Sequence, residues 1–174
     1  MMYRMIQSLL LVTLLSGCST LYDAVSKTGK VIWDPSIPIG EPEDRPSTVT
    51  IAMLADPAVN PNNSGESSPI AYQVLELRDK SRLMAADFDQ LLTKLEPSLG
   101  TNYINHEDFT LMPGEFKILR PEEISQRTHY IGVIAFYARP NEAQWKKVIE
   151  VEPTGGDYHL LMNFRETEVV LDKD

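Results

Sequence analysis

The segment Tyr130-Ile131-Gly132-Val133-Ile134-Ala135-Phe136-Tyr137 decides the fold class, because nearly every side chain along it is apolar. In a strand, successive side chains point to opposite faces of the sheet, so this segment is apolar on both faces. Strands with two apolar faces are typical of sheet interiors. We therefore expect residues 129–138 to form a central strand.

Alternation with a period of two marks further strands on either side of this segment. Val49, Ile51 and Met53 alternate with smaller side chains over a strand that closes at Asp56-Pro57. Other strands are expected from Ile70 to near Leu77 and over residues 108–112, 115–119, 145–151, 158–165 and 167–171. We expect Gly155-Gly156-Asp157 to be a hairpin turn. Many short strands separated by Gly, Pro or Asn turns predict a mainly β fold, a sandwich of two sheets.

Helical spacing occurs once, between the second and third expected strands. Asp87 and Gln90 are placed as a capping-box pair, and Pro97 as a stop. Packing of a short amphipathic helix against the sheet is the favoured interpretation, although its apolar stripe would also suit a partner. The stripe follows the i, i+3, i+4, i+7 pattern and consists of Phe88, Leu91, Leu92 and Leu95.

The connection between the first two strands, residues 56–69, is rich in Asn, Pro, Ser and Gly. Loops of this length without structure of their own are uncommon inside compact domains and are often functional. We expect a binding loop here, with a solvated connector as the plain alternative.

The N-terminus has the layout of a bacterial lipoprotein leader. A basic start at Arg4 precedes an apolar run over residues 5–15, and Leu15-Ser16-Gly17-Cys18 forms a lipobox. The run is shorter than the roughly 18 to 20 apolar residues of a membrane-spanning helix. We expect cleavage of residues 1–17 and acylation of Cys18, with palmitate among the chains. An ordinary secretory signal with a chance cysteine is the alternative.

Several acyl chains on one residue give durable membrane anchoring. Ser19 follows the cysteine in place of the aspartate that retains lipoproteins in the inner membrane, so we expect the outer membrane and a domain facing the periplasm. Residues 18–47 are proline-rich and are expected to be a tether, in which Trp33 either packs on the domain or contacts a partner. The sandwich is expected over residues 48–174, with its helical insertion near residues 80–100.

Charge and cysteine content exclude several classes of protein. The chain has 16 basic and 25 acidic residues, a net charge of −9, which becomes −10 once Arg4 leaves with the leader. Such a surface repels nucleic acid and anionic lipid headgroups. Cys18 is the only cysteine, so the fold has no intramolecular disulfide and depends on its hydrophobic core.

Beyond the lipobox, a series of short motifs spans nearly all of the mature domain. They are Asn60-Pro61, Gly65, Ser68-Pro69-Ile70, Leu77-Arg78-Asp79, Phe88 with Leu91-Leu92, Leu99-Gly100, Leu111-Met112-Pro113-Gly114, and residues 128–137 followed by Trp145. Their order and spacing resemble those of the TssJ family, outer-membrane lipoproteins of type VI secretion systems. One segment departs from the family pattern: Tyr72-Gln73-Val74-Leu75-Glu76 lacks the arginine and the tyrosine-glutamine pair expected there.

This resemblance implies a two-sheet transthyretin-like β-sandwich with a short helical insertion and no cofactor apart from the covalent lipid on Cys18. It implies that the chain binds the periplasmic C-terminal domain of the inner-membrane protein TssM, in a complex that also contains TssL, and links this complex to the outer membrane. Family members use the loop between the first two strands for the contact with TssM. In this sequence the corresponding candidates are Asn60, Pro61, Asn62, Asn63, Ser64 and Gly65.

An enzyme is the rival class, and its candidate residues are few. His106-Glu107-Asp108 suggests a metal site only weakly, since no second ligand cluster has the required spacing, and a solvated turn is favoured. Asp157 and His159 share a strand face but lack a nearby nucleophile motif. Glu122-Glu123 is expected to begin a polar helix. We therefore expect no catalytic and no metal site.

A third class is another periplasmic lipoprotein adaptor, such as a pilotin, or a β-sandwich that binds a small ligand in a cleft. Pilotins are expected to be helical or repeat-rich, which the period-two pattern opposes. A small-ligand binder is expected to copurify with its ligand, whereas a secretion scaffold associates with one large periplasmic domain.

Overall fold

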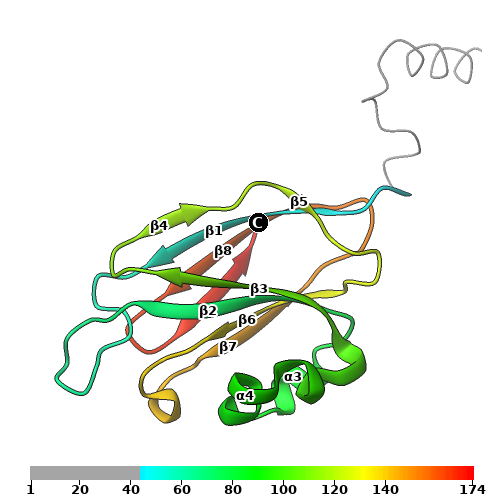
Figure 1. Ribbon diagram of the computed structural model, residues 1–174. Helices are drawn as coiled ribbons and strands as arrows, with labels where there is room; N and C mark the ends of the chain where they lie inside the picture. Colours follow the sequence, from blue (N-terminus) through cyan, green and yellow to red (C-terminus); the bar gives the residue numbers. More distant parts are fainter. Residues whose placement is uncertain (1–43) are drawn as a thin grey trace, which may run out of the picture. The chain divides into compact units, whose positions relative to one another are not determined.

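The structure, a computed structural model, describes residues 44–174. Two β-sheets face each other, and two short helices lie against the outer face of one of them (Figure 1). The strands are β1 (Thr48–Ala55), β2 (Ile70–Leu77), β3 (Tyr103–Leu111), β4 (Phe116–Ile118), β5 (Glu122–Glu123), β6 (Tyr130–Ala135), β7 (Lys146–Glu150), β8 (Asp157–Phe164) and β9 (Val169–Lys173). The helices are α3 (Ser81–Ala85) and α4 (Phe88–Leu99), with short 3-10 turns at Gly100–Asn102 and Pro140–Glu142. The predicted mainly β sandwich with a helical insertion is confirmed.

The first sheet has the order β4-β1-β8-β9, with β5 also paired to β1, and the second has the order β3-β2-β6-β7. β1 and β8 run parallel, with Thr48 opposite Asp157 and Ala55 opposite Phe164. The other neighbouring strands are antiparallel. Residues 45–47, expected at the end of the tether, are joined to the segment before β8, because Ser47 N donates to Pro153 O and Gly155 N donates to Arg45 O.

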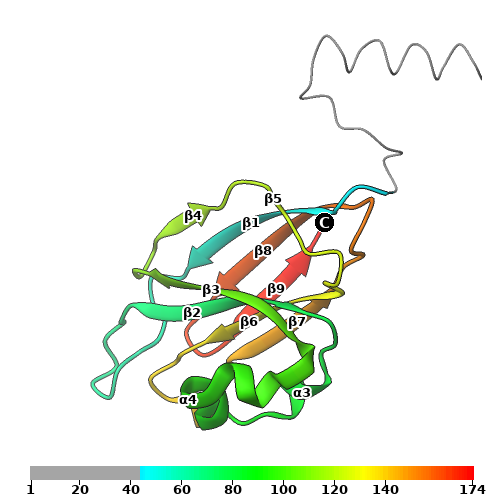
Figure 2. The ribbon, with the colours of Figure 1, turned by 45° about the vertical axis from the view of Figure 1, so that its right-hand side comes forward.

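The main core consists of buried apolar side chains from both sheets, whose strands are labelled in Figure 2. Tyr72 of β2 lies at its centre, with its ring centroid 4.4 Å from that of Phe164 and 5.4 Å from that of Phe109. Its hydroxyl donates to Met53 Sδ at 2.8 Å. Because the fold has no disulfide, burial of these side chains carries its stability, at about 1.5 to 3 kcal/mol for each large apolar side chain.

A second core explains why the central strand is apolar on both faces. β6 lies between β2 and β7, as predicted, and Ile131, Val133 and Ala135 face the main core. Ile134 faces the other way, into a cluster with buried residues of α3 and α4. A Cβ at Gly132 would meet Leu83 Cδ2 at 2.9 Å, so glycine here allows α3 to lie close to the sheet.

The predicted helix is present, with its Asp87–Gln90 capping box, but two details differ from the prediction. Pro97 lies inside α4 rather than ending it, because the helix is interrupted at Lys94, whose φ and ψ are −144° and 52°. Leu92 is 53 % exposed, although the spacing placed it on the buried stripe. The stripe therefore packs on the sheet through Leu91, while Leu92 faces solvent.

α3 was not predicted as a separate helix, and a lysine of the sheet holds its C-terminal end. Lys146 of β7 donates from Nζ to the carbonyl oxygens of Leu83, Met84 and Ala86, at 3.0, 2.8 and 2.7 Å. A cation at the C-terminus of a helix is favourable because the unpaired carbonyl groups there carry partial negative charge. Burial lowers the pKa of Lys146, and nearby Asp87 partly opposes this shift.

Three local predictions were wrong, and in each case pairing with a distant strand decides the conformation. Gly155-Gly156 does not join a hairpin, since the chain passes there from β7 in one sheet to β8 in the other. Glu122-Glu123 begins no helix but forms β5 opposite Val49 and Thr48. Residues 106–108 are not a turn, because β3 starts at Tyr103 and pairs with β2 along its length.

Candidate partner-binding loops

The base of the loop over residues 56–69 is fixed by a buried asparagine. Asn60 is 6 % exposed and has a φ of 49°, a left-handed conformation that asparagine tolerates better than most residues. Its Nδ2 donates to Pro69 O at 2.8 Å, and its Oδ1 accepts from Ala138 N at 2.7 Å. One side chain thus closes the loop on itself and ties it to the connection between β6 and β7.

The tip of the loop is a tight turn organised by Asn62. Asn62 Oδ1 accepts from the backbone N–H groups of Ser64 and Glu66, at 2.8 and 3.0 Å. Asn62 N donates to Glu66 O and Gly65 N donates to Asn62 O, so backbone bonds close the same turn. Gly65 has a φ of 80°, which strongly favours glycine at this position. The tip is therefore ordered before any partner arrives.

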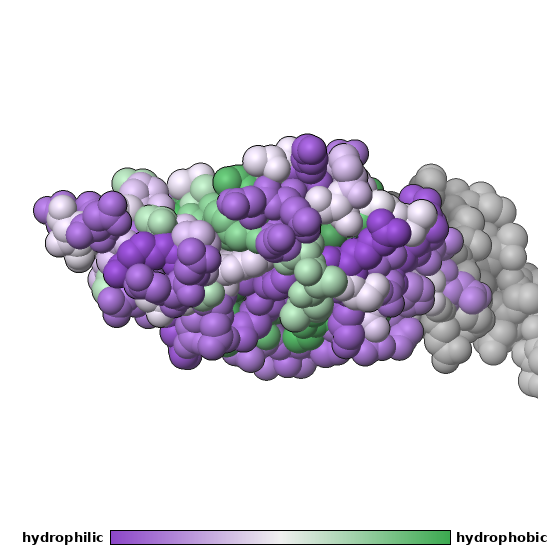
Figure 3. Space-filling model, turned by 90° about the horizontal axis from the view of Figure 1, so that it is seen from below, coloured by the Kyte–Doolittle hydropathy of each residue, from purple (hydrophilic) through white to green (hydrophobic). Residues whose placement is uncertain are grey.

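The six candidate residues lie in one loop but occupy different environments. Asn60 and Pro61 are buried at the base, and Asn62 is half-buried beneath the turn. Asn63, Ser64 and Gly65 are exposed at the tip, together with Glu66 and Ser67. Viewed from below in Figure 3, this projecting end of the molecule is hydrophilic. A partner approaching from solvent meets the tip, whereas the base holds the tip in place.

Three other connections lie beside this loop at the same end of the sandwich. Asp56 N donates to Phe164 O, next to the turn between β8 and β9. Ala55 pairs through its backbone with Gly114 and Glu115, in the turn between β3 and β4. Together with the contact from Asn60 to Ala138, these bonds define a loop end formed by residues 56–69, 112–115, 136–145 and 165–168.

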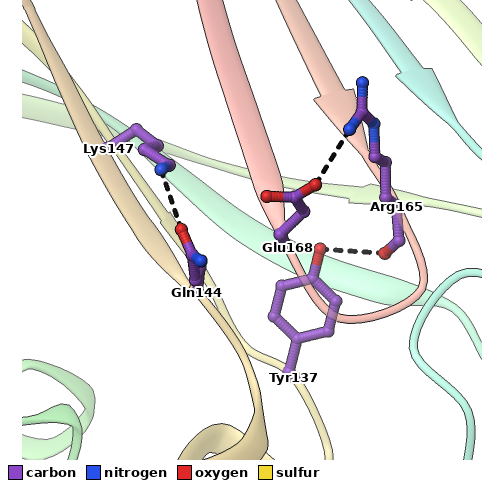
Figure 4. Close-up of polar contacts among 5 residues, drawn as sticks. All are labelled: Tyr137, Gln144, Lys147, Arg165 and Glu168. Carbon is purple, nitrogen blue, oxygen red and sulfur yellow. Dashed lines mark hydrogen bonds and ion pairs between the residues drawn. The ribbon is translucent and has the colours of Figure 1, made fainter.

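One polar contact joins two of these connections, and two others lie within or beside a single connection (Figure 4). Tyr137 OH donates to Arg165 O at 3.0 Å, and the Arg165 guanidinium lies 2.9 Å from the Glu168 carboxylate. Lys147 Nζ donates to Gln144 Oε1 at 3.0 Å. Burial of the Tyr137 phenol, with the negative charges of Glu168 and Asp56, raises its pKa above the ordinary value.

Sequence reasoning missed the exposed side chains that surround the loop. Met112 and Phe116 are 56 % and 57 % exposed, on either side of the turn at Pro113-Gly114. The ion pairs Arg139–Glu142 and Arg165–Glu168 add charge at the same end. The turns themselves were visible in the sequence, but only the strand pairing places them beside residues 56–69.

The candidate catalytic residues do not assemble into a recognisable active site. His106 Nδ1 lies 2.8 Å from Tyr103 OH, and its Nε2 lies 3.6 Å from Asp108 Oδ2 on the same face of β3. His159 and Asp157 are exposed and 4.0 Å apart. Within residues 44–174, no three His, Cys, Asp or Glu side chains gather so as to hold a metal ion.

A sequence model of the type VI secretion lipoproteins, described as "Type VI secretion lipoprotein, VasD, EvfM, TssJ, VC_A0113", matches residues 47–167. The chain belongs to this family. The resemblance predicted from the short motifs is therefore confirmed. A search of curated protein sequences found no match.

Solved structures agree with this family assignment. The type VI secretion lipoprotein TssJ1 of Pseudomonas aeruginosa is 25% identical, with a TM-score of 0.70 over 74% of this chain and 97% of that chain. Lip of Serratia marcescens, a membrane-bound component of the type VI secretion system, is 26% identical, with a TM-score of 0.64 over 74% and 98%. A structure described as the TssM C-terminal domain from EAEC contains a chain that is 20% identical, with a TM-score of 0.61 over 72% and 97%, which shows the fold alone.

The expected leader, the lipidation residue Cys18 and Trp33 lie outside the described residues. In the part of the chain that the structure does describe, no helix is long and apolar enough to cross a bilayer.

Proposed function

We propose that this family member is an outer-membrane lipoprotein that binds the periplasmic C-terminal domain of TssM through the loop over residues 56–69. In this proposal residues 1–17 are the cleaved leader, acyl chains on Cys18 hold the chain in the membrane, and residues 18–47 let the sandwich reach into the periplasm. The TssM complex, which also contains TssL, is thereby linked to the outer membrane. The protein acts by binding and catalyses no reaction.

The observation that carries this proposal is the preordered loop tip on a rigid base. A loop fixed by Asn60 and Asn62 loses little conformational freedom on binding, so more of the contact energy appears as affinity. Its exposed Asn63 and Ser64 offer hydrogen-bonding groups, and loops held by a rigid scaffold are common binding sites. Family membership and the fold shared with a chain in a TssM structure support TssM as the partner.

Because the base of the loop is buried, the binding role of the loop is best tested by substitutions at its exposed tip. Deletion of residues 60–65 would remove Asn60 and Pro61 from the interior and disturb the fold. Asn63→Arg combined with Ser64→Arg instead adds bulk at the tip and leaves the Asn62 side chain and the backbone turn in place. Gln126→Arg is the matched control, because Gln126 is exposed in the connection before β6, at the opposite end of the sandwich.

Calorimetry of residues 19–174 with the periplasmic C-terminal domain of TssM measures the effect. We expect the tip variant to bind at least tenfold more weakly and the control to bind as the unaltered chain does. Equal affinity for all three proteins would mean that TssM does not bind at the loop tip. A pull-down of residues 19–174 from envelope extracts, followed by mass spectrometry, identifies the partner without assuming it.

The anchor is tested separately. Cys18→Ser should give an unprocessed chain that takes up no radiolabelled palmitate, because serine lacks the thiol that accepts the diacylglyceryl group. Palmitate still entering this variant would contradict the lipidation site. Cell fractionation of the unaltered chain should place it in the outer membrane, with the sandwich protected from protease until that membrane is opened.

A further inference from the structure

β3 is an open edge of the second sheet. Within residues 44–174 it pairs only with β2, over Tyr103–Leu111, with an irregularity at Ile104 (Figures 1 and 2). An edge strand presents unpaired N–H and C=O groups, to which an extended peptide can add as a further strand. Long edges of this kind are usually protected by charged side chains, and here Glu107 and Asp108 are exposed near its middle.

A pocket lies between the sheets, directly inside this edge. Its volume is about 60 Å³, several times the roughly 10 to 15 Å³ that one water molecule needs. The floor consists of apolar side chains from both sheets, namely Val49, Ile51, Val74, Phe109, Leu119 and Ile131. In an added strand, every second side chain would point into this pocket, as Phe109 and Glu107 do from β3 itself.

The rim of the pocket is acidic. Glu76, Glu107, Glu122 and Glu123 line it, against one cationic side chain, that of Arg120. Lys117 adds one more cation nearby, with Nζ 5.0 Å from the centroid of the Phe109 ring. Glu76 is already engaged, because it accepts from Ser125 N at 2.9 Å and from Thr128 Oγ1. The remaining carboxylates are exposed and available to a basic ligand.

We propose that the β3 edge and this pocket form a second binding surface, which takes an extended, basic segment of a partner protein as an added strand. Alternate side chains of that segment enter the pocket as apolar groups or as the aliphatic stems of Lys or Arg. Its positive charges meet Glu107 on the pocket side of β3 and Asp108 on the other side. This surface lies along one side of the sandwich and is distinct from the loop tip proposed to bind TssM.

A second copy of this chain fits the surface poorly. Pairing of two β3 edges would bring Glu107 and Asp108 of one copy close to the same carboxylates of the other, and like charges directly opposed across a sheet are destabilising. The net charge of −9 adds to this repulsion. The acidic β3 edge therefore disfavours pairing with a second copy of this chain and favours an added strand that carries positive charge.

The test uses the full chain in detergent and three fluorescent octapeptides, followed by fluorescence anisotropy. The first is a repeat of Lys-Val, the second has the same lysines but prolines in place of alternate valines, and the third is a repeat of Glu-Val. Proline lacks the N–H that an added strand must supply and so separates strand addition from attraction between charges alone. We expect the Lys-Val peptide to bind at least tenfold more tightly than either control.

Substitutions then locate the site. Glu107→Gln and Asp108→Asn should each weaken binding about two- to fivefold, the range of exposed ion pairs. Leu119→Trp should fill the pocket from its floor and weaken binding at least tenfold. Asp172→Asn is the matched control, because Asp172 is an exposed carboxylate on β9, an edge strand of the other sheet, and should change nothing. The variant with arginines at positions 63 and 64 should also bind the peptide normally.

Amide hydrogen exchange distinguishes strand addition from attraction between charges, because only an added strand hydrogen-bonds to the backbone of β3. Strand addition should slow exchange of the outward-facing N–H groups of β3, and an unaltered exchange rate in the bound state would overturn the proposal. So would equal binding of the proline peptide, equal losses from Asp172→Asn and Glu107→Gln, or no binding of the Lys-Val peptide at millimolar concentration.

Discussion

Asn60 is the residue whose replacement should most clearly separate the base of the loop from its tip. Asn60→Ala removes two hydrogen bonds, to Pro69 O at 2.8 Å and from Ala138 N at 2.7 Å. It also leaves a residue with a Cβ but no local hydrogen bonding at a φ of 49°. Asn60→Gly loses the same two bonds, yet glycine adopts this backbone conformation without strain.

The expected cost follows from these contacts. Each buried hydrogen bond contributes about 1 kcal/mol net, and a left-handed residue with a Cβ costs about 1 kcal/mol more than glycine. We therefore expect Asn60→Ala to lower the free energy of unfolding by about 3 kcal/mol and Asn60→Gly by about 2 kcal/mol. A domain with a total stability of about 5 to 15 kcal/mol survives either change, but with a weakened loop.

Urea unfolding of residues 19–174, followed by tryptophan fluorescence and circular dichroism, measures both values. Asn63→Ala is the control, since an exposed side chain at the tip should change stability by less than about 0.5 kcal/mol. If Asn60→Ala cost no more than this control, the two hydrogen bonds would not fix the loop. If Asn60→Gly were the more damaging variant, the left-handed backbone at position 60 would not be the source of the extra cost of alanine.

Other substitutions test the core, the helical insertion and the loop end. Tyr72→Phe should change the free energy of unfolding by less than about 1 kcal/mol in urea titrations, because its buried hydroxyl donates only to Met53 Sδ, a weak acceptor. Lys146→Met should cost about 1 to 2 kcal/mol and speed amide exchange in α3, because the carbonyl groups at the end of that helix lose their donor. Because the folded state raises the pKa of Tyr137, the phenol proton is held more tightly than in the unfolded chain, so stability is retained up to about pH 10 and falls as pH rises further. Tyr137→Phe should make that alkaline fall shallower in thermal melts, and an unchanged slope would count against the buried phenol.

Patterns among residues close together in the sequence were sufficient to predict much of the fold. Alternation over Val49, Ile51 and Met53 predicted β1, and the strand from Ile70 to Leu77 has the bounds that were expected. The apolar run of β6 predicted its central position, and the capping box predicted the start of α4. In each case the residues that set the pattern are neighbours along the chain, so sequence spacing carries the signal.

The sequence-based predictions were wrong where contacts between residues distant in sequence decide the local conformation. Alternation predicts a strand and its two faces but not the strand with which it pairs. The residues around β1 and β8 therefore did not indicate that these two strands are neighbours in the sheet. Leu92 obeys helical spacing, yet α4 is interrupted at Lys94 and this side chain faces solvent. Glu122 and Glu123 are good helix formers, and pairing with β1 outweighs that local preference.

The same limit applies to the binding site. Composition identified residues 56–69 as a candidate loop, but the buried position of Asn60 depends on Ala138, far along the chain. Met112 and Phe116 are ordinary apolar residues in the sequence, and only the pairing of β4 with β1 places them beside the loop. The sequence therefore predicts which segment to examine, and the fold determines which of its side chains a partner can reach.

The parallel pair of β1 and β8 has a consequence for the timing of folding. β1 occupies the middle of its sheet, with β4 and β5 on one side and β8 on the other, and β8 is complete only at Phe164, whereas β1 ends at Ala55. The pairing of β1 with β8 cannot form until residues as far apart in sequence as Thr48 and Phe164 are both available, and contacts so distant in sequence form slowly. The pairing of β1 with β8 is therefore expected to be a late step in the folding of the domain.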